Sequence, residues 1–163
     1  MITEITSVVA VVLSVIYLGL QIRDNTKVLR SQAHYNALSL AQRPMEMMIE
    51  NDGLAAVVNR GYATPEALGA DDWARFGNYA FIGFNAWEYL YYQNRDGSIP
   101  KELWVGADAY FKGLVETKPG LTRFWAEFHD SFDEPFRSYV AAEVARASAP
   151  VAAVGGPVGA GSA

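Results

Sequence analysis

The residues that could do chemistry in this chain are few and poorly grouped. Its two histidines, His34 and His129, stand far apart, and there is no cysteine. A di-iron bundle needs Glu-x-x-His on two helices, but position 31 is serine and position 126 is alanine. The lack of cysteine excludes thiolate catalysis and thiolate metal sites. The sequence therefore predicts no metal and no cofactor.

The second histidine, His129, stands beside Asp130 in "FWAEFHDSF". Neighbouring residues on a helix do not face each other, so the pair is a poor catalytic dyad. The glycine-rich phosphate loops and the nucleophile elbow of hydrolases are also absent from the sequence. We interpret both histidines as surface or partner-facing residues, and we predict that the chain is not an enzyme.

Glu88 is the most interesting carboxylate, because it lies within the aromatic stretch "NAWEYLYYQN". A buried carboxylate can be a functional acid with a raised pKa, but more often it pairs with an arginine. We favour the ion pair, with Arg75, Arg95, Arg123 and Arg137 as candidates. The residues that could form a pocket or an interface here are Trp87, Glu88, Tyr91, Tyr92 and Trp104. On a helix such a stripe is more often core, with the surplus tyrosines at a rim or a partner surface.

Composition limits the class of protein. A chain of 163 residues fits one domain. Its formal net charge of −5 argues against a general nucleic-acid binder, which carries a basic footprint. Aromatic residues make up 13% of the chain, which suits both a core and an interface.

The first helical segment is the strongest feature of the sequence. Ile5 to Ile22 is a run of 18 residues without a charge, and a helix of that length spans about 27 Å, close to the thickness of a bilayer core. A soluble helix usually keeps a polar stripe, yet from Val8 to Leu20 only Ser14 is clearly polar. We predict a transmembrane anchor over residues 1–22. The alternative is a soluble all-α domain with residues 5–22 as its core helix.

Charges after the run predict its orientation. Arg23, Lys27 and Arg30 follow it directly, and the positive-inside rule places such residues in the cytoplasm. We expect a single-pass protein of the bacterial inner (cytoplasmic) membrane, with its N-terminus outside and its C-terminal domain cytoplasmic. Within the run, Ala10 and Ser14 would allow close helix packing and Tyr17 suits an interfacial position.

The remaining sequence is helical in period throughout. We expect one helix from about Thr3 to Arg43 that Pro44 ends or kinks, and a second from Pro44 to Gly61. Three more follow, separated by the turn "RDGSIP" and by "KPG", and the last of them pauses at residues 133–135. No alternating strand pattern occurs. The fold class is all-α, with a single transmembrane helix that continues into a small antiparallel bundle over residues 23–146. The Ala/Gly/Pro-rich tail, residues 147–163, is of disordered type.

Four stretches carry a resemblance to a set of small bacterial proteins whose activity is uncharacterised. They are "IYLGLQIRDNTKVLRSQA" (16–33), "NRGY" (59–62), "WEYLYYQNRDGSIPKELW" (87–104) and "PGLTRFWAEFHDSFDEPFRSYV" (119–140). The chain resembles that family over most of residues 5–140. The resemblance implies an N-terminal membrane helix followed by a cytoplasmic helical domain, and it implies no activity and no functional residues.

These observations favour a non-catalytic single-pass membrane protein. It would act as an accessory, assembly or scaffolding subunit, and its partners would be the lipid bilayer and other membrane subunits or a second copy of itself, but no nucleic acid. An alternative is a membrane-associated small-molecule-binding protein or enzyme with an aromatic pocket around Glu88.

Overall fold

The computed structural model describes the backbone of residues 2–148 and the side chains of residues 9–148. That part of the chain is all-α and contains no β-strand, as the sequence predicts. Its elements are α1 (Ile2–Glu50), α2 (Asp52–Ala63), the 3₁₀ turn η1 (Pro65–Ala67), α3 (Ala70–Arg95), α4 (Lys101–Thr117), α5 (Pro119–Phe128), the 3₁₀ turn η2 (His129–Ser131) and α6 (Phe136–Ser148).

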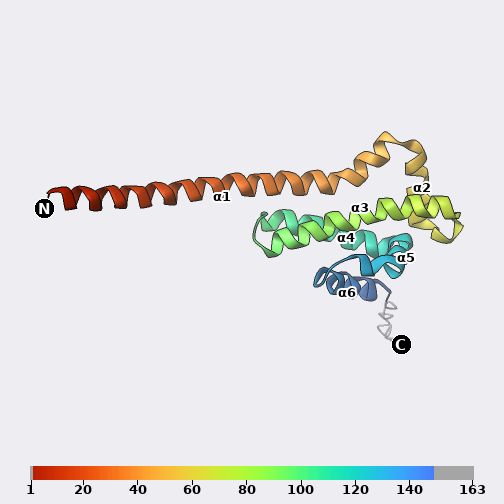
Figure 1. The fold of residues 1–163 in the computed structure, drawn as a ribbon. Coiled ribbons are helices and arrows are strands. Elements are labelled where there is room, and N and C mark those ends of the chain that lie inside the picture. The colour runs from red at the N-terminus through yellow and green to blue at the C-terminus, as the bar shows by residue number, and fades with distance from the viewer. Residues whose placement is uncertain (1, 149–163) are drawn as a thin grey trace, which may run out of the picture.

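The long helix α1 does not end at the proline that the sequence analysis selects. Pro44 lies inside α1, which continues to Glu50 and bends over its last turns (Figure 1). The true break is at Asn51, which has extended backbone and whose side chain accepts a hydrogen bond from the Leu54 N–H at 2.9 Å. A proline removes one backbone hydrogen bond and can kink a helix without ending it, whereas an N-cap residue starts a new helix.

The turn between α3 and α4 forms as predicted. Gly97 has a φ of +66°, a left-handed conformation that glycine adopts without steric cost. Pro100 then precedes the first residue of α4. α3 has Gly69 at its N-cap, and Asp71 and Asp72 lie in its first turn.

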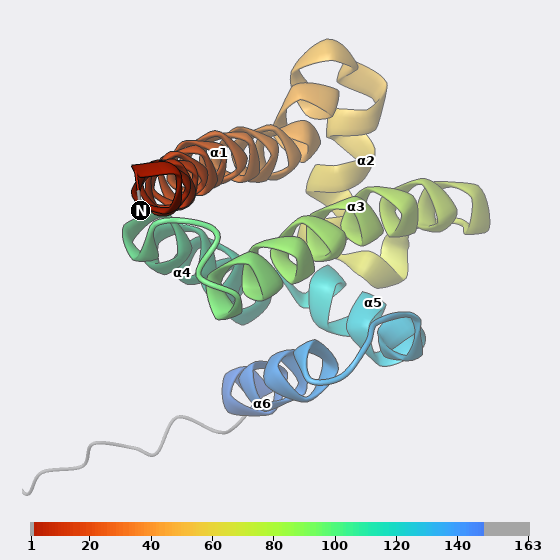
Figure 2. The same cartoon turned by 60° about the vertical axis from the view of Figure 1, so that its left-hand side comes forward.

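Helix α3 lies at the centre of the bundle. In both views α1 runs over one side of α3, while α5 and α6 lie on the opposite side and α4 packs alongside (Figures 1 and 2). The first half of α1 extends well beyond the bundle and packs on none of these helices (Figure 1).

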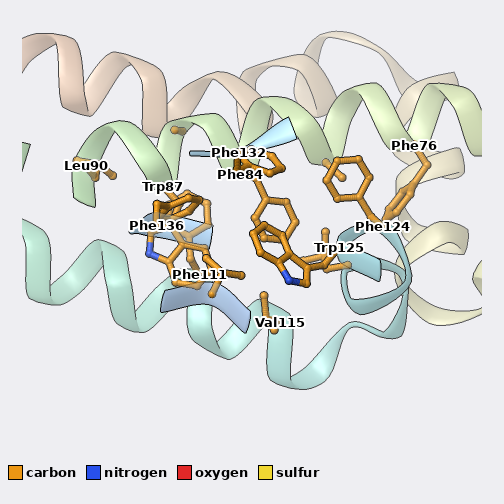
Figure 3. Packing of buried hydrophobic residues seen from close by; sticks show 14 of the residues in the cluster. Phe76, Phe84, Trp87, Leu90, Phe111, Val115, Phe124, Trp125, Phe132 and Phe136 are labelled. Carbon is orange, nitrogen blue, oxygen red and sulfur yellow. The ribbon is translucent and has the colours of Figure 1, made fainter. Parts of the chain in front are cut away.

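The core between α3, α4, α5 and α6 consists mainly of aromatic rings (Figure 3). Trp87 of α3 is fully buried and stacks on Phe111 of α4 with ring centroids 5.5 Å apart. Phe84 stacks on Phe124 of α5 at 5.4 Å, and its ring also lies 5.2 Å from that of Trp125. Such pairs add to the free energy of burying large apolar surfaces. The aromatic face of α3 is therefore the centre of this core.

Two glycines allow α2 and α5 to cross closely. A Cβ atom added to Gly120 would collide with the backbone carbonyl of Gly61, and one added to Gly61 would collide with the Phe76 ring. Neither position has room for a side chain. Both glycines are explained by packing rather than by backbone conformation.

The anchor and the tail predicted from the sequence lie at the two ends of the chain. Among the described residues, no helix has an apolar stretch long enough to cross a membrane. The predicted anchor covers residues 1–22 and its uncharged run begins at Ile5, but the side chains of residues 1–8 lie outside the described part. α6 includes Ala147 and Ser148, which the sequence analysis assigns to the tail. The remainder of that predicted tail, residues 149–163, lies outside the described residues.

Candidate functional site

The part of α1 that leaves the bundle is the most unusual surface of the molecule. Every residue from 9 to 32 is exposed, and we call this segment the free half of α1. Between Val9 and Ile22 the large apolar side chains are 46–68% exposed. Large apolar residues occupy most positions of this stretch, which contains no charged residue. Because a helix turns once in 3.6 residues, these side chains point in all directions around it. The interpretation of residues 5–22 as a core helix of the bundle is therefore wrong for residues 9–22.

The residues proposed for anchoring and orientation all lie on this free half. The Ser14 hydroxyl donates to the Ala10 carbonyl at 2.8 Å, which satisfies it within its own helix. Tyr17 is exposed. Asp24 lies 3.7 Å from Arg23 and 4.0 Å from Lys27. All three groups are well exposed, so these ion pairs contribute little stability.

A groove opens where α1, at the end of its free half and over the next two turns, passes the turn between α3 and α4. It has a volume of about 630 Å³ and is open to solvent. The α1 residues that line it are Arg30, Ser31, His34, Tyr35 and Leu38, and the turn contributes Gly97 to Pro100. His34 is thus a surface residue at the edge of a groove, which agrees with its interpretation from the sequence.

The predicted aromatic group does come together, but its members fill the space between them. Tyr91 lies 6.0 Å from Trp104 and 5.4 Å from Tyr92, measured between ring centroids. Tyr139 of α6 closes the group, 5.1 Å from Tyr91 and 6.0 Å from Trp87. This is a packed cluster at the edge of the core, formed by α3, α4 and α6.

Glu88 lies one helical turn before Tyr92 on α3 and is not paired with an arginine. Its Oε1 accepts a hydrogen bond from the Asp133 backbone N–H at 3.1 Å. Burial raises the pKa of this carboxyl above its ordinary value, and the Asp133 N–H opposes that rise. The ion pair favoured from the sequence is therefore wrong. Glu88 instead caps the backbone of the segment that leads into α6.

The four candidate arginines bind elsewhere. Arg123 is the clearest case, since its guanidinium lies 4.0 Å above the Trp73 ring and donates to the Pro65 carbonyl at 2.9 Å and to Glu127 at 3.0 Å. The other three pair with acidic residues close to them in sequence, as Arg75–Asp72, Arg95–Asp96 and Arg137–Glu134. All four arginines are therefore paired with acidic residues other than Glu88.

A polar cluster that the sequence analysis missed joins α3, α4 and α6. Asp108 of α4 accepts hydrogen bonds from the Trp87 Nε1–H at 3.0 Å and the Tyr139 hydroxyl at 2.7 Å. Lys112 lies 2.8 Å from Asp108 and 3.0 Å from Glu143. The side chains of Asp108 and Glu143 are only 13% and 17% exposed. A paired, hydrogen-bonded cluster of this kind fixes how three helices meet.

The pKa shifts in this cluster follow from its contacts. Burial alone would lower the pKa of Lys112, but hydrogen bonds with Asp108, Tyr139 and Glu143 outweigh it and raise the pKa. Burial raises the pKa of Tyr139 to about 12. Burial opposes the ionised form of Glu143, yet hydrogen bonds from Lys112 and Arg146 lower its pKa overall. Each group thus keeps its ordinary charge at neutral pH, which is typical of a structural cluster.

A small cavity lies where the last turns of α1 meet the bundle. Its volume is about 30 Å³, enough for about one or two water molecules. Its lining includes Tyr62 and Tyr79, whose hydroxyls lie 3.1 Å apart, as well as Trp87. Glu88 lines neither this cavity nor the open groove.

Two further findings bear on function. Within the described part of the chain, no three histidine, aspartate or glutamate side chains are grouped so that they could hold a metal ion. Comparisons with family models, with curated proteins and with solved structures find no match to this chain. Function is therefore inferred from the surfaces of the protein itself.

Proposed function

We propose that this protein is a single-pass membrane protein whose helical domain serves as a non-catalytic accessory, assembly or scaffolding subunit. The observation that carries the proposal is the free half of α1. Its apolar side chains are exposed on every side over residues 9–22. Contiguous apolar surface of this size marks a membrane or partner contact.

The full apolar run supports a bilayer rather than a groove on another protein. The run begins at Ile5 and ends at Ile22, so it is 18 residues without a charge, near the minimum length for a helix that spans the hydrocarbon core. A helix that docks in a groove needs only one apolar face. A helix that is apolar all round needs apolar surroundings all round.

Basic residues support the orientation. Arg23, Lys27 and Arg30 are all exposed and follow the run within about two turns. Such residues stay on the cytoplasmic side. The bundle would then be cytoplasmic, in a bacterial inner membrane, with the N-terminus outside.

The interior of the bundle supports a role in binding rather than catalysis. Its aromatic core is filled, and the cavity of about 30 Å³ is far below the roughly 300 Å³ of a small-molecule site. A ligand pocket around Glu88 has less support, because that carboxylate already accepts a backbone hydrogen bond. Most of the exposed large apolar side chains in the described part of the chain lie on α1, where an assembly subunit would make its contacts.

Extraction of native membranes tests the proposal. The chain should stay in the membrane pellet after alkaline carbonate and high salt, and should move to the supernatant only with detergent. After mild detergent it should migrate with a partner or as an oligomer. Release by carbonate would overturn the anchor. A free monomer in detergent, with nothing bound, would overturn the role as a subunit.

A further inference from the structure

We propose that two copies of this chain pair in parallel along one stripe of α1, an inference that rests on the membrane anchor proposed above. The stripe follows steps of four and three residues without interruption, which is the heptad repeat of a left-handed coiled coil. We call it the α1 seam, and it consists of Ala10, Ser14, Tyr17, Gln21, Asp24, Val28, Ser31, Tyr35, Leu38 and Gln42.

The first observation concerns the apolar part of α1. Residues 9–22 contain three polar side chains, Ser14, Tyr17 and Gln21, and all three fall on the seam. Ala10 adds a small residue one turn before Ser14. In lipid, small and polar side chains gather where helices contact each other, because lipid tails offer them no hydrogen bonds. The few uncharged polar side chains of the apolar run therefore lie along one line of the helix, where they suit contact with another helix.

The second observation is that the seam becomes mainly apolar after Lys27. Val28, Tyr35 and Leu38 are large apolar residues, exposed by 58%, 71% and 41%. In water it is apolar residues at these heptad positions that drive helix pairing. The bundle covers a different face of the same helix, where Ala37 is fully buried. The seam is thus free along the straight part of α1.

The third observation is space beside the seam. Ser31, Tyr35 and Leu38 also line the open groove of about 630 Å³ next to the turn Gly97 to Pro100. A groove bounded on one side by a helical stripe has the shape that another helix fills. The turn would then lie against the partner helix.

Several features select a second copy as the occupant. Two identical anchors enter the membrane from the same side, so their helices run parallel and in register. In that arrangement each flanking residue meets the residue five positions later in the other copy, as Lys27 with Gln32 and His34 with Ser39, so no like charges meet among the flanking residues. On the seam itself, Asp24 faces Asp24 of the other copy. Asp24 is the one charged seam residue, and each copy already places Arg23 and Lys27 within 4.0 Å of it. The seam and its flanks supply about 20 residues from each helix, the lower end of a standard interface.

Cysteine cross-linking in native membranes tests the pairing, and the chain has no cysteine of its own. The variants Tyr35→Cys and Leu38→Cys place a thiol on the seam, whereas Asn36→Cys places one on an exposed face that points away from it. With an added oxidant, the two seam variants should form a disulfide-linked band of twice the monomer mass, at least five times more than Asn36→Cys.

The same membranes are extracted with carbonate, so that the two proposals can fail separately. Equal cross-linking at the three positions, or a cross-link to a different protein in place of the doubled band, would overturn the pairing while a retained chain would leave the anchor intact. Seam-specific cross-linking of a chain that carbonate releases would uphold the pairing through the aqueous part of α1 and overturn the anchor.

Discussion

Residues 9–22 and residues 33–48 belong to the same helix, yet they meet their surroundings in opposite ways. The later segment buries one narrow face on the bundle, where Ala37 is fully buried and Pro44 is buried, and exposes the rest. The earlier segment is apolar all round and touches nothing in the structure. Small residues are enough for a helix that packs on one side. A helix with large apolar residues on every side needs a continuous apolar environment.

Introducing charge into the earlier segment should have the largest effect of the changes considered, because it should remove that segment from the membrane. The double variant Val12→Lys and Ile16→Lys should leave the membrane fraction, because each lysine near a helix centre costs about 2.5 to 3.5 kcal/mol of insertion free energy. The free energy of unfolding of the bundle should change by less than about 0.5 kcal/mol, since neither residue contacts it.

Leu40→Lys is the matched control for that pair, because Leu40 is an exposed residue of the later segment. It should leave carbonate retention unchanged. Retention of the double variant at the wild-type level would remove the distinction between the two segments.

Within the bundle, Asp108→Ala should have the largest effect on stability. It leaves the Trp87 N–H and the Tyr139 hydroxyl without their acceptor and leaves Lys112 with Glu143 as its remaining acidic partner. Removing one member of such a part-buried pair costs about 3 kcal/mol or more. Urea unfolding in mild detergent, followed by tryptophan fluorescence, measures the loss. Asp130→Ala removes a well-exposed carboxylate that lies near Arg137 and His129, and it should cost less than about 1 kcal/mol. Equal losses from the two variants would show that the cluster is not structural.

Gly120→Ala should destabilise the bundle by about 2 kcal/mol, because the added methyl collides with the Gly61 backbone and the helices must separate. Gly113→Ala in α4 is the control, since nothing lies within 4 Å of its added Cβ. That change should stabilise the protein by about 0.5 to 1 kcal/mol, the usual gain in helix propensity. The same urea unfolding measures both. A gain at both positions would contradict the close crossing of α2 and α5.

The smallest effect concerns the pH dependence of Glu143. Its pKa in the folded protein is lowered from the ordinary value of 4.5, so its ionised form contributes stability above that pH and loses it as the pH falls through the lowered pKa. The destabilisation caused by Glu143→Gln should therefore be full above about pH 5 and vanish in stronger acid. Unfolding curves measured from pH 7 down to acid test this. The exposed Glu116→Gln serves as the control, and a destabilisation by Glu143→Gln that persisted in acid would refute the linkage.

Much of the fold was predictable because local signals and burial agreed. The turn between α3 and α4 follows from Gly97 and Pro100, and the core face of α3 follows from aromatic residues at helical spacing. The break after α1 was misplaced, since Pro44 is a strong local signal that the helix tolerates. The Asn51 cap that ends α1 is a weaker signal on the sequence.

The contacts of the site residues were harder to predict from the sequence, because their partners are distant along the chain. Asp108 meets Trp87 and Tyr139, which are 21 and 31 residues away. Only its spacing of four from Lys112 was visible in advance. The sequence contains four arginines that could pair with Glu88, but in the structure each of them pairs with an acidic residue closer to it in sequence. Nothing in the sequence indicates that the partner of Glu88 is a backbone N–H.

Accessibility of single cysteines along α1 tests the central claim most directly. In inside-out membrane vesicles, a membrane-impermeant maleimide should label Arg30→Cys and Leu40→Cys rapidly and should leave Val12→Cys and Ile16→Cys unlabelled until detergent is added. Labelling of Val12→Cys in intact vesicles as fast as Leu40→Cys would show that the free half of α1 lies in water, and the account of this protein as a membrane-anchored subunit would be contradicted.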